Sequence, residues 1–315
     1  SARRIVAIVG PTASGKSDLA VELSARLGGE IVSCDSVQVY RGLDVGSGKP
    51  SPEDRARVPH HLLDILELHE EMNAAVFAQR AAAAIADIGG RGNLPIVTGG
   101  TGLYLTALLK GLFEQGAPDP AVRGRIEGLA DRYGSARLHR LLTRKDPDYA
   151  LKTQPTDRVR IVRALEVCFG LGRPFSRAQQ DRRPAFAGET LMVGLHPGRD
   201  ELRARVTARV KGMLSGGLIE ETRRALANAP PGGPIPRPLG AIGYREVAAR
   251  LASGPLNAGG DDELQRAIVI SSMQYAKRQM TYFRGQFNVE WFAGSGAAAE
   301  RVTRWVEGQD MGKQE

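Results

Sequence analysis

The stretch that decides the fold is GPTASGKS, Gly10–Ser17. It fits the phosphate-binding loop pattern G-x-x-x-x-G-K-[ST] without a gap. The short apolar run RRIVAIV (3–9) precedes it, and SDLAVELSARL (17–27), with apolar residues at helical spacing, follows it. The sequence therefore predicts a buried strand, a phosphate-binding loop and a helix, in that order.

This loop offers three kinds of phosphate ligand. Backbone N–H groups from Ala13 to Ser17 can point at phosphate oxygens, helped by the dipole of the following helix. The Lys16 cation and the Ser17 hydroxyl, which can ligate Mg²⁺, complete the set. ATP or GTP is the usual ligand of such a loop. The candidate phosphate-binding residues are Gly10, Pro11, Thr12, Ala13, Ser14, Gly15, Lys16 and Ser17.

Strand-like and helix-like patterns alternate along the first part of the chain. EIVSCD (30–35) and LPIVTGG (94–100) are predicted strands, and the Ala-rich stretch 72–90 between them is a predicted helix. From 117 to 187 only helical patterns occur, and LMVGLHP (191–197) returns to a strand pattern. We predict an α/β fold: a P-loop NTPase-like parallel sheet core (1–116 and 188–315) with an inserted all-helical domain (117–187) and C-terminal helices.

The positive charge is concentrated in that insertion. Residues 115–187 carry 15 Lys and Arg against 8 Asp and Glu, whereas residues 1–114 carry 11 against 13 and residues 188–315 carry 17 against 14. A localised basic excess is typical of a nucleic-acid partner. A well-solvated helical surface explains the same charge and stays open as the alternative.

Composition excludes a membrane-spanning protein and gives no metal site. The chain is 42% apolar and 25% charged, and it has no run of about eighteen apolar residues. Cys34 and Cys168 lack ligand-spaced partners, which indicates free thiols and a cytoplasmic location. His60 and His61 also lack such partners, so we expect a structural role for them.

The acids near the loop do not match a nucleotide-hydrolysing enzyme. Such enzymes hold Mg²⁺ with an Asp at the end of a buried strand. The third predicted strand ends in Thr98-Gly99-Gly100 without a carboxylate, and the second ends in Asp35. An Asp at that position faces the crevice beyond the strand ends, where open α/β sheets bind substrates. A small-metabolite kinase remains possible, because the positions of its acids vary.

Further along the chain, the motifs become specific. DSVQVYRGLDVGSGKP (35–50), PHHLLDI (59–65), VTGGTGLY (97–104), RALEV (163–167), GAIGYRE (240–246) and AKRQMTYFR (276–284) follow the loop in this order. Together they resemble the tRNA dimethylallyltransferase family over roughly residues 5–292. The chain departs from the family at SGKP (47–50), where Thr-Ala-Lys-Pro is common, and at Tyr282-Phe283, where a Trp is usual.

The resemblance implies a different ligand for the loop. It implies that the loop holds the pyrophosphate of dimethylallyl diphosphate rather than the tail of ATP. The acceptor would be the N6 amine of the adenosine immediately 3′ of a tRNA anticodon, and the products N6-isopentenyladenosine and pyrophosphate. Mg²⁺ is the implied cofactor. The implied partners are the anticodon stem-loop and dimethylallyl diphosphate, and we expect a monomer.

The residue types suit that chemistry. Negative charge grows on the departing pyrophosphate, so fixed donors and cations such as Lys16 and Arg209 would stabilise it. Asp35 is the candidate base for the weakly nucleophilic adenine amine, or a strand-end capping residue. Thr101 is a candidate ligand of the bridging oxygen, or a helix cap. Arg205 lies one helical turn from Arg209 and could share the pyrophosphate. The resemblance favours Arg209 of the two, and a solvated helix face is the alternative for both.

The candidate tRNA contacts fall into three groups. Near the base are Asp35, Ser36, Val37, Gln38 and Thr101, whose polar groups can meet unstacked bases of a loop. The other two groups can grip phosphates or loop bases, with ordinary surface charge as the alternative for each residue. In the insertion they are Arg123, Arg158, Val159, Arg160, Ile161, Val162 and Arg163. Towards the C-terminus they are Gly243, Tyr244, Arg245, Lys277, Arg278 and Arg284.

Two other functions explain part of the sequence. A P-loop kinase of a small metabolite accounts for the phosphate loop but not for the basic insertion. A non-catalytic RNA-binding protein switched by nucleotide accounts for the charge but leaves Asp35 without a task. Only an RNA-modifying prenyltransferase accounts for both features.

Overall fold

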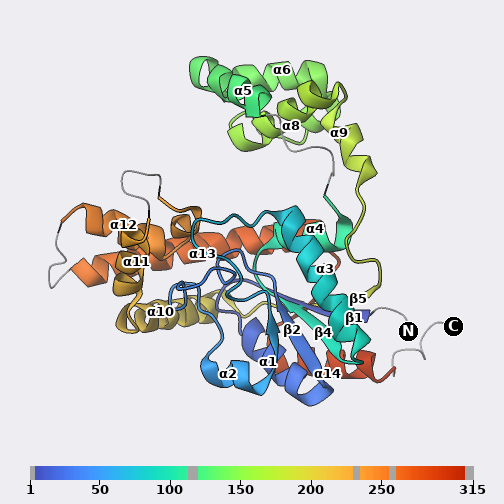
Figure 1. Cartoon of the computed structure of the whole chain (residues 1–315), viewed down its shortest axis with the longest axis vertical. Helices are drawn as coiled ribbons and strands as arrows, with labels where there is room; N and C mark the ends of the chain where they lie inside the picture. Colours follow the sequence, from blue (N-terminus) through green and yellow to red (C-terminus); the bar gives the residue numbers. More distant parts are fainter. Residues whose placement is uncertain (1–3, 113–119, 230–234, 255–259, 309–315) are drawn as a thin grey trace. The chain divides into compact units, whose positions relative to one another are not determined.

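A computed structural model describes residues 4–112, 120–229, 235–254 and 260–308 (Figure 1). The chain divides into two compact units. The core unit comprises Ser1–Leu109 and Phe186–Glu315, and the insertion unit comprises Lys110–Ala185. The sequence places the insertion at 117–187, and the start of that range lies outside the described residues.

A six-stranded sheet, parallel throughout, forms the centre of the core unit, in the order β3-β2-β4-β1-β5-β6. The alternation of strands and helices in the sequence predicted such a sheet, and the predicted fold class is confirmed. Two short edge strands, β3 and β6, were not predicted. The strands are β1 Arg4–Val9, β2 Gly29–Ser33, β3 His60–His61, β4 Leu94–Thr98, β5 Glu189–Leu195 and β6 Glu290–Phe292.

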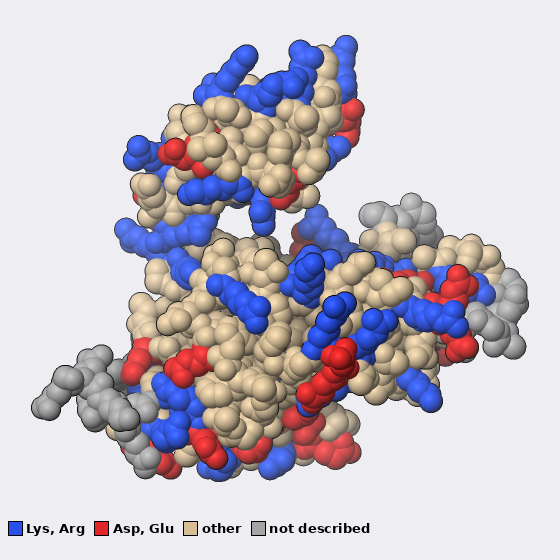
Figure 2. Space-filling model, turned by 180° about the vertical axis from the view of Figure 1, so that it is seen from behind, with Lys and Arg blue, Asp and Glu red and all other residues tan. Residues whose placement is uncertain are grey.

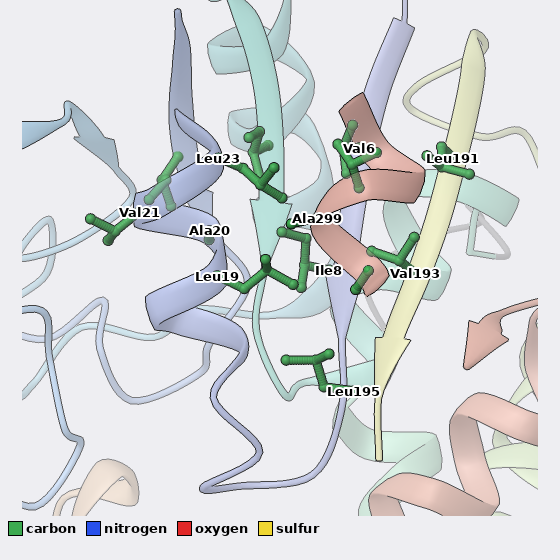
Figure 3. Close-up of a cluster of buried hydrophobic side chains, with 14 of the residues drawn as sticks. Val6, Ile8, Leu19, Ala20, Val21, Leu23, Leu191, Val193, Leu195 and Ala299 are labelled. Atoms are coloured by element: carbon green, nitrogen blue, oxygen red, sulfur yellow. The ribbon is translucent and has the colours of Figure 1, made fainter. Parts of the chain in front are cut away.

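Helices cover both faces of this sheet, as its continuous apolar strands require. Val6 and Ile8 of β1 pack in one cluster with α1 (Lys16–Leu27) and α14 (Ser295–Val306) (Figure 3). Ile5 and Ala7 alternate with them, point to the opposite face and are fully buried. On that second face α3 (Ala74–Gly90) packs against β2 and β4, and α4 (Gly102–Lys110) follows β4.

The remaining helices of the core unit surround a second apolar cluster. It joins the segment after β2 to the C-terminal helices, and α10 packs along α13 (Figure 1). The predicted break at Gly216-Gly217 separates α10 from α11. These helices are α10 Arg199–Ser215, α11 Leu218–Ala227, α12 Tyr244–Ala252 and α13 Gly260–Gln286, with a short 3₁₀ turn at Arg237–Gly240. The short helix α2, Pro52–Arg57, buries no residue and contacts α1 instead.

The described part of the insertion unit consists of helices and the loops that connect them. Its own apolar core contains Leu142, Ile161 and Leu165. The buried carboxylate of Asp146 accepts backbone N–H groups of Tyr149 and Ser176, at 3.1 and 2.7 Å, and so ties two short helices together. The helices are α5 Pro120–Tyr133, α6 Ser135–Lys145, α7 Pro147–Ala150, α8 Arg158–Leu171 and α9 Phe175–Ala178, followed by a 3₁₀ turn at Gln179–Asp181.

No helix in the described parts of either unit is long and apolar enough to cross a membrane.

Candidate active site

Three segments that follow neighbouring parallel strands line one cavity of about 800 Å³. The phosphate loop Gly10–Ser17 follows β1, Asp35 follows β2, and Gly99-Gly100 follows β4. The carboxyl ends of parallel strands meet at one edge of a sheet, so residues far apart in sequence converge there. We call this space the polar cavity.

The backbone of the phosphate loop has the conformation of an anion-binding turn. Ala13 and Gly15 have positive φ, 61° and 89°. A Cβ at Gly10 would lie 2.6 Å from the carbonyl oxygen of Leu195, so only glycine fits there. The Ser14 hydroxyl is buried and has no hydrogen-bond partner among the described residues. The strained backbone and the unpaired hydroxyl are what a loop built for phosphate oxygens would show.

Lys16 begins α1 and also lines the polar cavity. Its ammonium group donates to the carbonyl oxygen of Pro11 at 3.2 Å. Burial, and then the charge of Arg209, lower the pKa of Lys16 to about 8. An anion in the cavity would stabilise the charged form of Lys16, because it neutralises the neighbouring positive charges.

The two arginines of α10 differ in how they are engaged. Arg205 is exposed, pairs with Glu201 at 2.6 Å and donates to the Ser14 carbonyl oxygen at 3.1 Å. Arg209 is half-buried, and burial lowers its pKa. It donates to the Ser47 carbonyl oxygen at 3.4 Å, and no carboxylate of the described residues forms an ion pair with it. Arg209 is therefore the arginine whose charge is available to a ligand.

Asp35 combines a turn role with a place in the cavity. Its Oδ1 accepts the backbone N–H groups of Val37 and Gln38, at 2.8 and 3.2 Å. This is the capping role considered as the alternative for Asp35. Oδ2 forms no hydrogen bond with a described residue, and the side chain lines the polar cavity. One oxygen therefore fixes the turn while the other remains free for a ligand.

A second cavity, of about 320 Å³, adjoins the polar cavity and shares part of its lining. Asp35, Arg209, Thr12, Ser47 and Tyr275 line both. Much of the remaining wall is aliphatic, so we call it the apolar cavity. Its aliphatic lining comes from Val37, Val206, Val210, Met213, Ile242 and Ile268. A charged group in one cavity and a hydrocarbon group in the other would meet between Asp35 and Arg209.

Thr101 and Gln38 are held by contacts within the protein. The Thr101 hydroxyl accepts the backbone N–H of Ser36 at 3.1 Å and is not part of the cavity lining, although Gly100 before it is. The Gln38 amide donates to the carbonyl oxygens of Ser47 and Gly48 at 3.3 and 3.0 Å, and its oxygen accepts the Ser33 hydroxyl. Both side chains thus hold the turn that carries Asp35.

Two residues that the sequence analysis did not single out complete the site. Gln279 is buried on α13, and its oxygen accepts the Thr12 N–H at 2.9 Å. Tyr275, one turn earlier, lines both cavities. The signal for Gln279 was the stretch AKRQMTYFR (276–284), where only the charged and aromatic residues were considered, and Tyr275 directly precedes that stretch.

The three glycines of TGGTG (98–102) lie where a side chain would collide with a neighbouring segment. A Cβ at Gly99 would lie 2.1 Å from the Cys34 carbonyl oxygen, and one at Gly100 would lie 2.2 Å from Gln279 Nε2. A Cβ at Gly102 would lie 2.3 Å from the ring of Tyr282. These glycines let the strand end approach both the Asp35 turn and α13.

The structure corrects the tRNA prediction at three side chains. Tyr244 is fully buried, and its hydroxyl bonds to Glu221. Ile161 and Val162 are 0% and 4% exposed in the core of the insertion unit. Apolar or aromatic residues inside a motif were taken as contacts, but their burial leaves them no surface to offer. Their neighbour Val159 is 78% exposed.

The charged candidates are exposed. In the core unit Arg245 and Arg278 line the apolar cavity, Lys277 faces solvent, and Arg284 lies over the ring of Trp291. Gly243, also predicted, is buried before α12.

In the insertion unit every predicted arginine pairs with a carboxylate. The pairs are Arg123 with Glu127, Arg158 with Asp131, Arg160 with Asp157 and Arg163 with Glu166, at 2.9, 2.6, 3.4 and 3.0 Å. Figure 2 shows Lys and Arg covering more of the visible face of this unit than Asp and Glu. Except for that with buried Glu166, these pairs are at the surface and contribute little to stability, so their arginines can exchange partners.

The residues around Ser17 fit a metal ion held mainly through its ligand. Ser17 lines the polar cavity, as do Asp18 and Asp35. No three His, Cys, Asp or Glu side chains gather into a metal cage among the described residues. This is the pattern that suits Mg²⁺, which keeps several waters and takes oxygens from phosphates.

The two neighbouring histidines bond to groups of the protein. His61 bonds to buried Glu30 at 2.7 Å, and His60 bonds to the backbone carbonyl oxygen of Val58.

Comparison with known sequences gives one consistent result. Residues 38–286 match the family described as IPP transferase. A tRNA dimethylallyltransferase of Anaeromyxobacter dehalogenans (strain 2CP-C) is 48% identical over 290 residues, covering 92% of this chain and 95% of that protein. One of Geobacter metallireducens is 47% identical over 291 residues, covering 91% and 92%.

Solved structures agree with the sequences. The crystal structure of tRNA delta(2)-isopentenylpyrophosphate transferase from Staphylococcus epidermidis is 31% identical, with a TM-score of 0.67, over 98% of this chain and 99% of that one. A eukaryotic dimethylallyltransferase acting on tRNA shares the fold, with a TM-score of 0.79 and 24% identity over 99% of this chain and 81% of that one. The chain therefore belongs to the tRNA dimethylallyltransferase family.

Proposed function

We propose that this chain transfers the dimethylallyl group from dimethylallyl diphosphate to the N6 amine of the adenosine immediately 3′ of the anticodon in tRNA. Family membership supports this reaction. One structural observation carries it: Asp35 and Arg209 stand where a polar cavity with a phosphate loop meets an apolar cavity. An allylic diphosphate has a charged head and a short hydrocarbon tail that match these two spaces.

The diphosphate head binds in the polar cavity. The N–H groups of the phosphate loop, Lys16 and Arg209 converge there, with Arg205 at the rim. Negative charge grows on the departing pyrophosphate as the C1–O bond breaks, so these donors act most strongly in the transition state. Mg²⁺, held by Ser17 and the diphosphate oxygens, would neutralise part of the same charge.

The acceptor amine attacks beside Asp35. The N6 lone pair forms the bond to C1 of the dimethylallyl group while the bonding pair to oxygen leaves with pyrophosphate. The amine then carries an excess proton, which the free oxygen of Asp35 takes. Because Oδ1 is fixed by Val37 and Gln38, the carboxylate is already oriented before the tRNA arrives. Thr101 supports that turn by accepting the Ser36 N–H, so it positions the general base Asp35 and does not contact the diphosphate.

The tRNA side of the reaction rests on charge. An adenine in an anticodon loop must leave its stack to reach the cavity. Arg245 and Arg278 line the apolar cavity and can hold nucleotides flanking that adenine. The basic surface of the insertion unit supplies a second set of phosphate contacts. We further propose that the protein acts as a cytoplasmic monomer.

The proposal is tested by incubating the protein and Mg²⁺ with unmodified tRNA and dimethylallyl diphosphate. We expect the digested tRNA to contain N6-isopentenyladenosine, identified by its mass, with one pyrophosphate released per base. ATP in place of the prenyl donor should give neither product. A tRNA with guanosine immediately 3′ of the anticodon is the matched control. Consumption of ATP without a mass change in the tRNA would instead indicate a kinase or a nucleotide switch.

A further inference from the structure

A buried carboxylate holds the loop that touches Arg209. Glu221 on α11 is 3% exposed, and its two oxygens accept the backbone N–H groups of Asp44, Val45 and Gly46, at 2.8, 2.9 and 3.0 Å. A carboxylate that accepts several backbone N–H bonds is a strong anchor, because each bond is charge-assisted.

Tyr244 extends this anchor to the next residue. Its hydroxyl donates to Glu221 Oε1 at 2.6 Å and accepts the backbone N–H of Ser47 at 3.0 Å. Burial, together with Glu221, raises the pKa of Tyr244, so its proton stays on the phenol and points at the carboxylate. The ring packs so closely on the loop that a Cβ at Gly46 would lie 2.5 Å from its Cζ. Four successive N–H groups, 44 to 47, are thus bound by two side chains.

The far end of this loop is where Arg209 rests. Its Nη2 donates to the Ser47 carbonyl oxygen, and a Cβ at Gly48 would lie 2.2 Å from Nη2. Ser47 therefore connects the two parts: its N–H is held by Tyr244, and its carbonyl oxygen is held by Arg209. The position of this peptide decides where the guanidinium can lie in the polar cavity.

We propose that Glu221 and Tyr244 are positioning residues that fix the Asp44–Gly48 loop so that Arg209 faces the diphosphate. This inference rests on the proposed function and adds to it two residues that do not touch substrate. It also gives Tyr244, in the GYR stretch, a task inside the protein instead of on the tRNA.

Inorganic pyrophosphate with Mg²⁺ is a suitable probe, because it needs no tRNA and no turnover. Its binding is measured by calorimetry in a double-mutant cycle. Tyr244→Phe removes the hydroxyl while keeping the ring, and Arg209→Ala removes the side chain on which it acts. Thr222→Val is the matched control, since Thr222 is equally buried on α11 and its hydroxyl bonds only to Leu218 of the same helix.

We expect Tyr244→Phe to raise the pyrophosphate Kd about tenfold in the wild-type background and less than about twofold with Arg209→Ala, because coupled residues are not additive. Thr222→Val should leave the Kd unchanged even if it lowers the melting temperature. Gly46→Ala perturbs the same anchor from the loop side and should show the same dependence on Arg209, which covers the case of an unstable Tyr244→Phe.

Equal losses in both backgrounds would overturn the inference, since the hydroxyl would then act on stability or on another ligand. So would an unchanged Kd in both Tyr244→Phe and Gly46→Ala. If the wild-type protein itself binds no pyrophosphate, the phosphate site of the proposed function is wrong and the inference falls with it. Binding without coupling would leave the proposed function standing and remove only the positioning role.

Discussion

The side-chain oxygen of Gln279 accepts the backbone N–H of Thr12 at 2.9 Å, although the two residues are 267 positions apart in the chain. The same side chain donates through Nε2 to the carbonyl oxygen of Gly100, also at 2.9 Å. One buried amide thus joins α13 to the phosphate loop and to the glycine segment after β4. Because α13 also carries the exposed Lys277 and Arg278, the helix with these candidate tRNA contacts is tied directly to the phosphate loop.

Replacing Gln279 should therefore affect stability and phosphate binding together. Gln279→Met keeps the volume and loses both hydrogen bonds, which leaves the partly buried Thr12 N–H without this acceptor and the Gly100 carbonyl oxygen with only the Tyr275 hydroxyl, at 3.5 Å. We expect a loss of about 1–3 kcal/mol in unfolding free energy, measured by urea denaturation, and a weaker affinity for pyrophosphate. Gln274→Met, on the exposed face of the same helix, is the control. Equal behaviour of the two variants would show that the Gln279 bridge is not needed.

Asp35→Asn distinguishes the role of Asp35 as general base from its role as hydrogen-bond acceptor in the turn. Asparagine keeps an oxygen for the N–H groups of Val37 and Gln38 but cannot take the proton, so kcat should fall about 10²–10⁴-fold while tRNA affinity changes little. Asp35→Ala also loses the turn and should be worse in both quantities. Glu22→Gln, in the same cavity but in an exposed ion pair with Arg26, should have a small effect. Asp35→Asn with wild-type kcat would remove Asp35 from the catalytic role.

The lowered pKa of Lys16 gives phosphate binding a pH dependence. With a pKa of about 8 in the free protein, the ammonium is present below pH 8 and is lost as the pH rises through that value. Affinity for pyrophosphate should therefore fall between pH 7 and 9, measured by calorimetry. In Lys16→Arg the charge persists throughout this range, so the fall should disappear, because pyrophosphate's own ionisation only adds negative charge as the pH rises. Identical pH profiles would assign the titration to another group. Lys16→Ala should bind and use dimethylallyl diphosphate weakly at every pH.

Gly48 is a site where this chain's own residue matters. It lies in SGKP, where the family often has Ala, and Arg209 occupies the space of the missing methyl group. Its φ of +59° also disfavours other residues. Gly48→Ala should lower stability by about 1 kcal/mol through the backbone and, by displacing Arg209, weaken pyrophosphate binding. Gly42→Ala has a similar φ of +75° and open space around it, so it should show the stability loss alone. If the two variants bind pyrophosphate equally, the close approach of Arg209 has no effect on binding.

The central part of the fold followed from local patterns. Short apolar runs ending in Gly, Asp35 or Thr98 predicted the buried parallel strands, because such strands are apolar on both faces. The edge strands β3 and β6 could not be predicted in this way. His60–His61 and Glu290–Phe292 have two and three residues and no apolar run. They are strands because a neighbouring strand offers them hydrogen bonds, which is a tertiary effect.

The sequence predicted the site residues whose charged side chains face the cavity, but not those that bind backbone groups and hold the site in place. Lys16 and Asp35 were identified from their charge and motif, and Arg209 from its charge and the family resemblance; the three meet at one cavity. Gln279 and Glu221 were missed because a neutral amide and one more acidic residue on a helix carry no local signal. Only the fold shows that they bind backbone groups from segments far away in the chain. Tyr244 was misassigned for the same reason.

The predicted RNA contact of the insertion unit can be tested from both partners of its ion pairs, the arginines and the aspartates. Arg158 and Arg160 are exposed and pair with Asp131 and Asp157. Each phosphate contact releases counterions, so replacing both arginines with glutamine should weaken tRNA binding and flatten its salt dependence by roughly one unit per lost contact. Asp131→Asn with Asp157→Asn should have the opposite effect. It frees both arginines, so affinity and salt slope should rise, measured by filter binding across salt concentrations. Pyrophosphate affinity should be unchanged in both double mutants, because none of these residues lines the polar cavity. If neither pair of substitutions moves the tRNA affinity, the charge of the insertion unit is solvated surface, and the grip on tRNA lies with Lys277, Arg278 and Arg284 on α13.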